Sequence, residues 1–242
     1  MPSITVTVQT HIATITLDSE SQHNVLDAAL RAEFALAIQK VDDDHDIRIV
    51  VVTGANGVFA RGIDHMPGSL GPQGAASAIA SLRKPTVAWI DGECLDMGLE
   101  LALACDVRFA SNTSTFGLCG VKQGALPWDG GTQRLSRAVG RGQALRLLLT
   151  GEVILADEAL RIKLIEGVGE SLIVADWIAR AAAGAPIAAA YAKEATMAAG
   201  DLPLAQGLRL EADLSVLLQS TADRAEGLEA FTAKRKRQFE GR

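Results

Sequence analysis

The chain has 242 residues, of which 48% are hydrophobic and 21% are charged. This composition is ordinary for a globular protein, and the length suits one large domain or two closely joined ones. The net charge of −6 argues against general binding to nucleic acids or anionic membranes. No apolar run approaches the ~20 residues that span a bilayer.

The cysteines and histidines argue against structural cross-links and metals. The three cysteines, an odd number, show no CxxC spacing, so we expect reduced, packed thiols rather than a disulfide framework or zinc site. The four histidines form no HxxxH pair, so we expect no metal site. The first residues lack the layout of a signal peptide, and reduced thiols suit the cytosol, so a cytoplasmic protein is expected.

The first fifty residues predict two strands, a helix and a buried strand, in that order. Residues 4–17 alternate between apolar residues and threonine, which predicts two half-buried strands joined near Thr10. Asp27 is a plausible N-cap for the helix that follows. The residues at its apolar helical spacing are Leu30, Phe34, Ala37, Ile38 and Val41. The β-branched run at 49–52 is typical of a strand buried on both faces.

The same unit recurs along the next ninety residues. A buried strand at 86–90, a helix at 99–104 and a short strand at 107–110 follow one another, with glycine-containing loops between them. The repetition from 48 to 140 predicts stacked β-β-α turns. From Gly142 onward the pattern predicts helices alone. We therefore expect an α/β core at residues 1–195 and a helical C-terminal region at 196–242.

Several common ligand-binding loops are missing from the sequence. No G-x-G-x-x-G follows a strand, and no G-x-x-x-x-G-K-[ST] occurs, so the usual dinucleotide and NTP loops are not present. A G-x-S-x-G nucleophile elbow is also missing. Three other loops remain as candidates, because each follows a predicted strand and combines glycine with a carboxylate: 58–64, 91–100 and 116–134.

At these loops the sequence resembles the crotonase family of enoyl-CoA hydratases and isomerases. The segments that carry the resemblance, in the family's order, are 46–54, 84–88, 99–106, 130–135, 149–151 and 227–235. The resemblance implies an α/β fold with a spiral core of β-β-α turns and a helical C-terminal trimerisation region. It also implies a homotrimer or a dimer of trimers.

The family's shared chemistry implies an oxyanion hole for a thioester enolate. By position, its two backbone donors would be the N–H groups of Ile63 and Met97, the latter at a helix N-terminus. Such donors are commonly worth ~3 kcal/mol each. Relatives usually carry glycine where Met97 stands, so methionine should reshape the pocket without removing the backbone donor.

Hydratases of this family use two glutamates, and only one of them has a counterpart in this sequence. Glu100 matches the first family glutamate, but Gly120 stands where the second is expected, and glycine cannot transfer a proton. We expect Glu100 and Asp129 to form the acid–base pair, with proton transfer contributing ~10²–10⁴-fold. The alternatives are that Glu100 merely favours the helix dipole and that Asp129 caps the next helix. Asp96 is expected to be an N-cap rather than an acid.

Cys94 and Cys119 flank the predicted pocket, but nothing in the sequence near them lowers a thiol pKa, so we expect both to pack.

The remaining matches concern the substrate. A histidine replaces the basic residue that usually contacts the nucleotide of CoA. The residues expected to contact substrate or CoA are His23, Val25, Ala60, Asp64, His65, Met66, Gly120, Phe231 and Lys234. The basic run 234–237 could pair with CoA phosphates or remain a solvated tail.

Three functions fit the sequence. The first is an acyl-CoA enzyme of the enoyl-CoA hydratase/isomerase type, which uses no cofactor apart from the CoA of its substrate. The second is a CoA-independent hydrolase that cleaves C–C bonds in β-diketones. The third is a catalytically silent acyl-CoA-binding protein, because fold alone does not fix activity.

Overall fold

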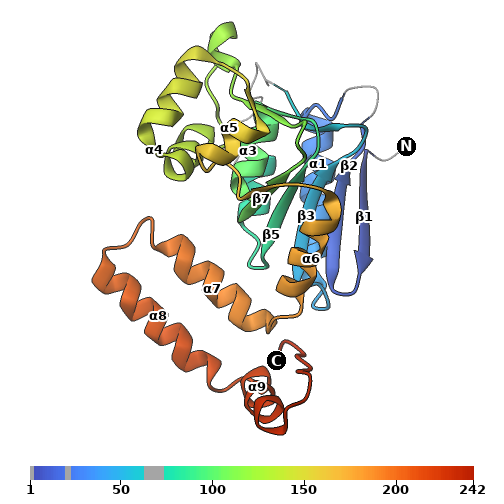
Figure 1. The fold of residues 1–242 in the computed structure, drawn as a ribbon, viewed down its shortest axis with the longest axis vertical. Helices are drawn as coiled ribbons and strands as arrows, with labels where there is room; N and C mark the ends of the chain where they lie inside the picture. Colours follow the sequence, from blue (N-terminus) through green and yellow to red (C-terminus); the bar gives the residue numbers. More distant parts are fainter. Residues whose placement is uncertain (1–2, 20–22, 63–73) are drawn as a thin grey trace.

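The computed structural model describes residues 3–19, 23–62 and 74–242, and two β-sheets form the centre of this part of the chain (Figure 1). A six-stranded sheet has the order β1-β2-β3-β5-β7-β10, and a four-stranded sheet has the order β4-β6-β8-β9. The strands are β1 (Ile4–Gln9), β2 (Ile12–Leu17), β3 (Ile49–Gly54), β4 (Val58–Ala60), β5 (Thr86–Ile90), β6 (Glu93–Leu95), β7 (Val107–Ala110), β8 (Thr115–Gly117), β9 (Ile154–Leu155) and β10 (Gly167–Val168).

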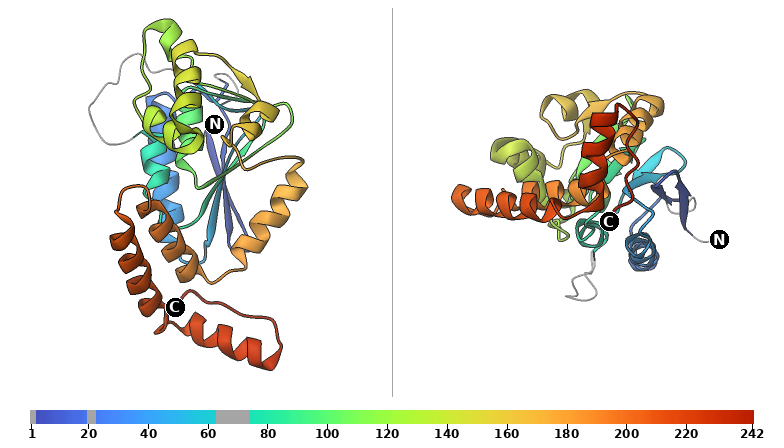
Figure 2. Two further views of the ribbon diagram at one scale, coloured as in Figure 1. Left: turned by 60° about the vertical axis from the view of Figure 1, so that its left-hand side comes forward. Right: turned by 90° about the horizontal axis from the view of Figure 1, so that it is seen from below.

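Helices lie against both faces of the larger sheet, and a helical segment extends beyond it (Figures 1 and 2). The helices are α1 (Ala28–Asp43), α2 (Ala75–Ala80), α3 (Met97–Ala104), α4 (Gly131–Thr150), α5 (Ala156–Arg161), α6 (Ser171–Ala182), α7 (Pro186–Ala198), α8 (Leu204–Leu218) and α9 (Ala222–Ala233). A 3₁₀ turn, η2 (Gly120–Gln123), precedes α4.

The N-terminal predictions are confirmed. Strands β1 and β2 pair antiparallel around the turn at Thr10. The Asp27 side chain caps α1 by accepting a 2.8 Å hydrogen bond from the Leu30 N–H. All five apolar residues at the predicted helical spacing are buried.

Strand β3 is buried on both faces, as its β-branched run predicts. Val50 and Val52 pack into the main core, whereas Ile49 and Val51 face the other way and pack against Val174 and Ile178 of α6. Each fully buried Val or Ile contributes roughly 1.5–3 kcal/mol relative to exposure. Strand β3 therefore contributes side chains to both hydrophobic clusters, which lie on opposite faces of the larger sheet.

Alternate strands along the chain enter the two sheets, which gives the core its spiral of β-β-α turns. Strands β3, β5 and β7 run parallel in the larger sheet, while β4, β6 and β8 run parallel in the smaller one. Helix α3 follows β6 directly along the chain. The expected α/β fold with a spiral core is confirmed, whereas the trimerisation role of the C-terminal helices stays a prediction.

The prediction of helices alone after Gly142 is wrong in detail. Strand β9 pairs with β8, and strand β10 pairs with β7. Each is two residues long, which is too short to show a strand's period of two in the sequence.

Helices α7 to α9 reach away from the sheets (Figure 2). The expected division between residues 195 and 196 falls inside α7, and it stays a prediction. Large apolar side chains are exposed along the segment from α7 to α9: Met197, Leu202, Leu204, Leu208, Val216, Leu217, Leu228 and Phe231. Within the described ranges, no helix is long and apolar enough to cross a membrane.

Candidate active site

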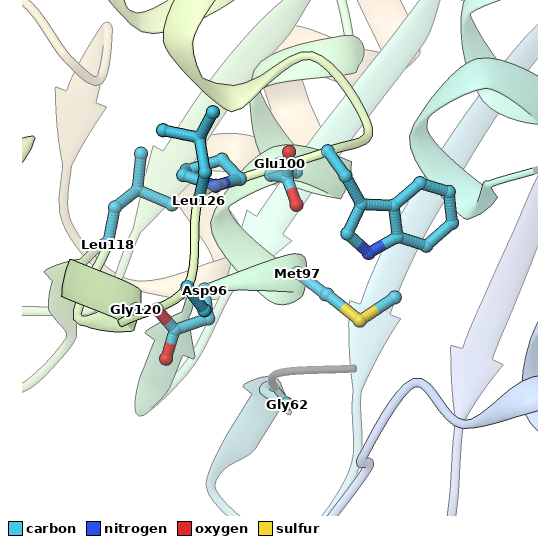
Figure 3. Close-up of a pocket in the computed structure, with 10 residues that line it drawn as sticks. Gly62, Asp96, Met97, Glu100, Leu118, Gly120 and Leu126 are labelled. Atoms are coloured by element: carbon cyan, nitrogen blue, oxygen red, sulfur yellow. The ribbon is translucent and has the colours of Figure 1, made fainter. Parts of the chain in front are cut away.

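A pocket lies where the N-terminus of α3 meets η2 and the loop before α4 (Figure 3). The sequence predicted three of its residues, Met97, Glu100 and Gly120, as parts of a site. The pocket is lined by Gly62, Asp96, Met97, Glu100, Leu118, Gly120, Ala125, Leu126, Pro127 and Trp128. Figure 3 shows the Met97 side chain between Glu100 and Gly62.

Glu100 is a buried carboxylate held by two backbone amides. Its side chain lies in the first turn of α3, the residue is only 2% exposed, and Oε1 accepts 2.8 Å hydrogen bonds from the N–H groups of Asp129 and Gly131. Neither bond uses Oε2. Burial raises the pKa of Glu100 from 4.5 to about 7, although the two amides act in the opposite direction. A carboxyl group with this pKa can both take and return a proton near neutral pH.

Met97 places its backbone N–H at the start of α3. The N–H donates a 3.0 Å hydrogen bond to the carbonyl oxygen of Gly62. The side chain is buried and lines the pocket. The expected second donor, Ile63, lies outside the described residues, as do the expected substrate contacts Asp64, His65 and Met66.

Gly120 lines the pocket at the position expected for a second acid. A Cβ built there would lie 3.1 Å from the Ala125 carbonyl oxygen, so the loop is closely packed around it. Among the described lining residues, the carboxylates are those of Glu100 and Asp96. No group of three or more potential metal ligands occurs in the described part of the chain.

Asp96 occupies the N-cap position of α3 but does not cap the helix. The backbone of Asp96 has a positive φ of 51°, and its side chain makes no hydrogen bond to the first turn of α3. Instead Oδ1 accepts a 2.6 Å hydrogen bond from the N–H of Cys119. Burial raises the pKa of Asp96, opposed by that backbone hydrogen bond. The expected N-cap role is corrected, because the carboxylate ties α3 to the loop after β8.

Asp129 points its carboxylate toward α2 rather than toward the pocket. The residue is 5% exposed, and its oxygens accept hydrogen bonds from the N–H of Ala76 at 2.7 Å, the N–H of Ser77 at 3.2 Å and the Ser77 hydroxyl at 2.6 Å. Gly74, the N-cap of α2, has no side chain to do this, and a Cβ there would overlap the Asp129 carboxylate. This geometry argues against the expected catalytic role and favours capping, with α2 rather than α4 as the helix capped.

Replacing Asp129 by asparagine should therefore destabilise the fold more than it slows any chemical step. Hydrogen bonds to a charged group are worth about 1.5–3 kcal/mol, so we expect a loss of that size in the free energy of unfolding. Urea denaturation measures it, and Ser77→Ala is a matched control that removes one hydroxyl donor and should cost about 1 kcal/mol. A turnover loss of about 100-fold at unchanged stability would instead support an acid–base role.

The expected CoA contacts are only partly brought together in one chain. Val25 forms a β-bridge with Arg61 next to buried Ala60, close to the pocket, whereas His23 is exposed. Phe231, which is 77% exposed, and Lys234 lie at the C-terminal end of α9, and Figure 1 shows α9 at the opposite end of the molecule from α3. Their expected role requires a neighbouring subunit.

The thiols near the pocket behave as packing groups. Cys94 is fully buried and Cys119 is partly buried, and both are unpaired. Burial raises the pKa of each thiol, so neither is a thiolate at neutral pH.

Trp128 is the pocket residue that sequence reasoning missed most completely. The Arg31 guanidinium lies over the Trp128 ring, 5.2 Å from the ring centroid, and Trp128 packs against the main core. The only sequence signal was its place between Pro127 and Asp129 in the loop that holds Glu100. The apolar residues missed with it are Leu118, Ala125, Leu126 and Pro127.

Comparison with known proteins extends the resemblance to the whole chain. The family model "Enoyl-CoA hydratase/isomerase" matches residues 7–242. The (E)-benzylidenesuccinyl-CoA hydratase of Thauera aromatica is 36% identical, over 98% of this chain and 99% of its own length. The 2,3-dehydroadipyl-CoA hydratase of Escherichia coli is 33% identical over all of both chains.

Solved structures agree with these sequence relatives. A crystal structure of enoyl-CoA hydratase from Bacillus anthracis superposes with a TM-score of 0.90 at 33% identity, over 100% of both chains. An enoyl-CoA hydratase from Mycobacterium marinum gives a TM-score of 0.92 at 27% identity, again over 100% of both chains. Sequence and fold together show that the chain belongs to the enoyl-CoA hydratase/isomerase family, the crotonases.

Proposed function

We propose that the protein is an acyl-CoA enzyme that forms a thioester enolate, with Glu100 as its acid–base group. The observation that carries the proposal is a buried carboxyl group with a pKa raised to about 7, in a pocket that Met97, the first residue of α3, also lines. The carboxyl can move a proton, and the backbone N–H of Met97 can stabilise the oxygen that becomes negative.

The proposed oxyanion hole uses the N–H groups of Met97 and Ile63. In the structure the Met97 N–H donates to the Gly62 carbonyl oxygen. A bound thioester would replace that carbonyl as the acceptor. Because its oxygen gains charge during the reaction while a peptide oxygen does not, the exchange favours the enolate over the ground state.

A single carboxylate is enough for the proton balance of either family reaction. In hydration, Glu100 takes a proton from water, the hydroxide oxygen bonds to the β-carbon, and Glu100 returns the proton to the α-carbon of the enolate. In isomerisation, Glu100 removes an α-proton from a 3-enoyl thioester and returns it at the γ-carbon. Gly120 favours isomerisation or another such proton shift, whereas relatives named as acyl-CoA hydratases favour hydration.

The acyl chain has a candidate path beyond the acid. A second pocket of about 340 Å³ shares Leu118, Ala125, Leu126 and Pro127 with the first, and α4 lines its far side with leucines. An apolar space that continues from the reacting carbon suits a hydrocarbon tail. We assign the acyl group to it.

The pH dependence of activity should report Glu100 directly. If its carboxylate takes the proton, kcat/KM for crotonyl-CoA hydration should rise with pH and level off above about 7, the pKa of the folded state. Initial rates between pH 5.5 and 9, with thermal melts at each pH, measure this. A flat profile across that range would exclude Glu100 as the titrating base.

Self-association forms part of the proposal. The exposed apolar side chains on α7, α8 and α9 form a surface that association would cover. A trimer or a dimer of trimers would also bring Phe231 and Lys234 to the CoA of a neighbouring subunit.

Product analysis tests the proposed function. The protein is incubated separately with crotonyl-CoA, a 3-enoyl-CoA and a β-diketone, and the products are identified by mass spectrometry. A 3-hydroxyacyl-CoA product shows hydration, a 2-enoyl-CoA product from the second substrate shows isomerisation, and cleavage of the diketone alone overturns the acyl-CoA proposal. Binding without any product would leave the catalytically silent alternative.

A further inference from the structure

A residue that lines the active-site pocket carries a hydrogen-bond donor that the proposed mechanism does not use. The indole nitrogen of Trp128, Nε1, is buried and has no hydrogen-bond partner, and it is the one buried side-chain nitrogen or oxygen in the described residues of which this is true. Trp128 lines the same pocket as Glu100 and Met97. Buried donors in folded proteins are nearly always paired, so an unpaired one in a binding pocket calls for an explanation.

The position of the ring is fixed rather than incidental. The Arg31 guanidinium lies 5.2 Å from its centroid, and the ring packs against the main hydrophobic core. On the chain, Trp128 directly precedes Asp129, whose N–H binds the Glu100 carboxylate and whose side chain caps α2. The donor is thus held on the loop that also holds the proposed acid–base group.

The chemistry of the donor limits its partner. An indole N–H donates and cannot accept, and it does not ionise in the physiological range. A molecule that enters the pocket can therefore pair with it only through an acceptor. The other residues with side chains there are mostly apolar, so a ligand that lacks an acceptor would leave the N–H desolvated and unpaired, which disfavours binding.

We propose that Trp128 is a specificity-determining residue whose indole N–H donates a hydrogen bond to an oxygen of the bound acyl group. The proposal rests on the acyl-CoA function above. The acceptor is either the thioester carbonyl oxygen or a second oxygen at the β-carbon of the acyl group, and the test separates the two.

The test follows the indole protons by NMR. The chain has three tryptophans, so protein labelled with ¹⁵N at the indole nitrogens should give three signals, and Trp128→Phe identifies the one of interest. Two acyl-CoA ligands that can be neither hydrated nor isomerised are added in turn: butyryl-CoA, whose acyl group has only the thioester oxygen, and acetoacetyl-CoA, which has a second oxygen at the β-carbon. Formation of the hydrogen bond should move the Trp128 proton signal downfield and leave those of Trp89 and Trp177 nearly unchanged.

Calorimetry on the same samples supplies the affinities. Trp128→Phe keeps an aromatic ring but loses the donor, and we expect it to weaken binding of the recognised ligand by about tenfold. Trp177→Phe is the matched control, because Trp177 packs against Phe109 with 5.3 Å between ring centroids, in the cluster on the α6 side of the sheet. If Trp128→Phe fails to fold, replacing Trp128 by 3-benzothienylalanine exchanges the N–H for sulfur in a ring of the same shape.

Each outcome decides the proposal. A downfield shift with both ligands assigns the thioester oxygen, and a shift with acetoacetyl-CoA alone assigns the β-oxygen. Binding of both ligands by the wild type without a shift, and with unchanged affinity in the Trp128 variant, overturns the proposal and leaves the enzyme function intact. If the wild type binds neither ligand, the acyl-CoA function itself fails, and the assignment of Trp128 fails with it.

Discussion

Replacing Glu100 by glutamine should lower kcat by about 10²–10⁴-fold, with a much smaller change in KM. Glutamine keeps an oxygen that can accept the N–H groups of Asp129 and Gly131, which bind Oε1 at 2.8 Å. It cannot take or return a proton. The loss of kcat should therefore reflect the chemical step. Initial-rate assays with crotonyl-CoA and a 3-enoyl-CoA measure it.

Two controls separate this loss from misfolding. Glu211→Gln makes the same substitution at an exposed position on α8 and should leave kcat unchanged. Because the pKa of Glu100 is raised to about 7 in the folded state from an ordinary 4.5, its contribution to stability is present below the unfolded value and is lost as the pH rises through 7. Glu100→Gln cannot ionise, so its Tm relative to wild type should increase between pH 5 and pH 8. Full turnover in a folded Glu100→Gln protein would remove Glu100 from the mechanism.

Replacing Gly98 by alanine should damage both the fold and the site. Gly98 follows Met97 in the first turn of α3, and a Cβ added there would overlap the backbone carbonyl of Ala60 in β4. Because the obstacle is backbone on both sides, α3 and β4 must move apart. Overpacking of this kind typically costs about 1–3 kcal/mol, and a shift of about 1 Å in a catalytic group can cost about 10²-fold in rate.

The matched control for this variant is Gly142→Ala in helix α4. A Cβ at Gly142 meets nothing within 4 Å, so the substitution should preserve activity and raise the free energy of unfolding by up to about 1 kcal/mol. Urea denaturation and kcat/KM of both variants make the comparison. If Gly98→Ala retains wild-type activity and stability, close contact between α3 and β4 does not position the Met97 amide.

Much of the fold could be predicted because its elements satisfy local rules. The alternation in β1 and β2, the cap at Asp27 and the β-branched run of β3 each follow from neighbours in the sequence. Strands β9 and β10 could not be predicted this way, since two residues carry no period and their pairing depends on partners far along the chain.

The candidate site likewise has parts that the sequence could predict and parts that depend on tertiary packing. Glu100 and Gly120 could be placed by family position, and the structure puts both in one pocket. The direction of the Asp129 carboxylate depends on α2, which lies more than fifty residues earlier, so no local pattern could give it. No local pattern could predict that the indole N–H of Trp128 is unpaired, because only the tertiary packing buries it.

The most direct measurement of the central claim is exchange of the α-protons of butyryl-CoA in D₂O, followed by mass spectrometry. This ligand has no double bond, so exchange requires only that a base remove the proton while the pocket stabilises the enolate oxygen. The account predicts that wild-type protein incorporates deuterium at the α-carbon and that Glu100→Gln, although folded and able to bind the ligand, does not. Bound butyryl-CoA that stays unlabelled on the wild-type protein, or equal labelling by both proteins, would contradict it.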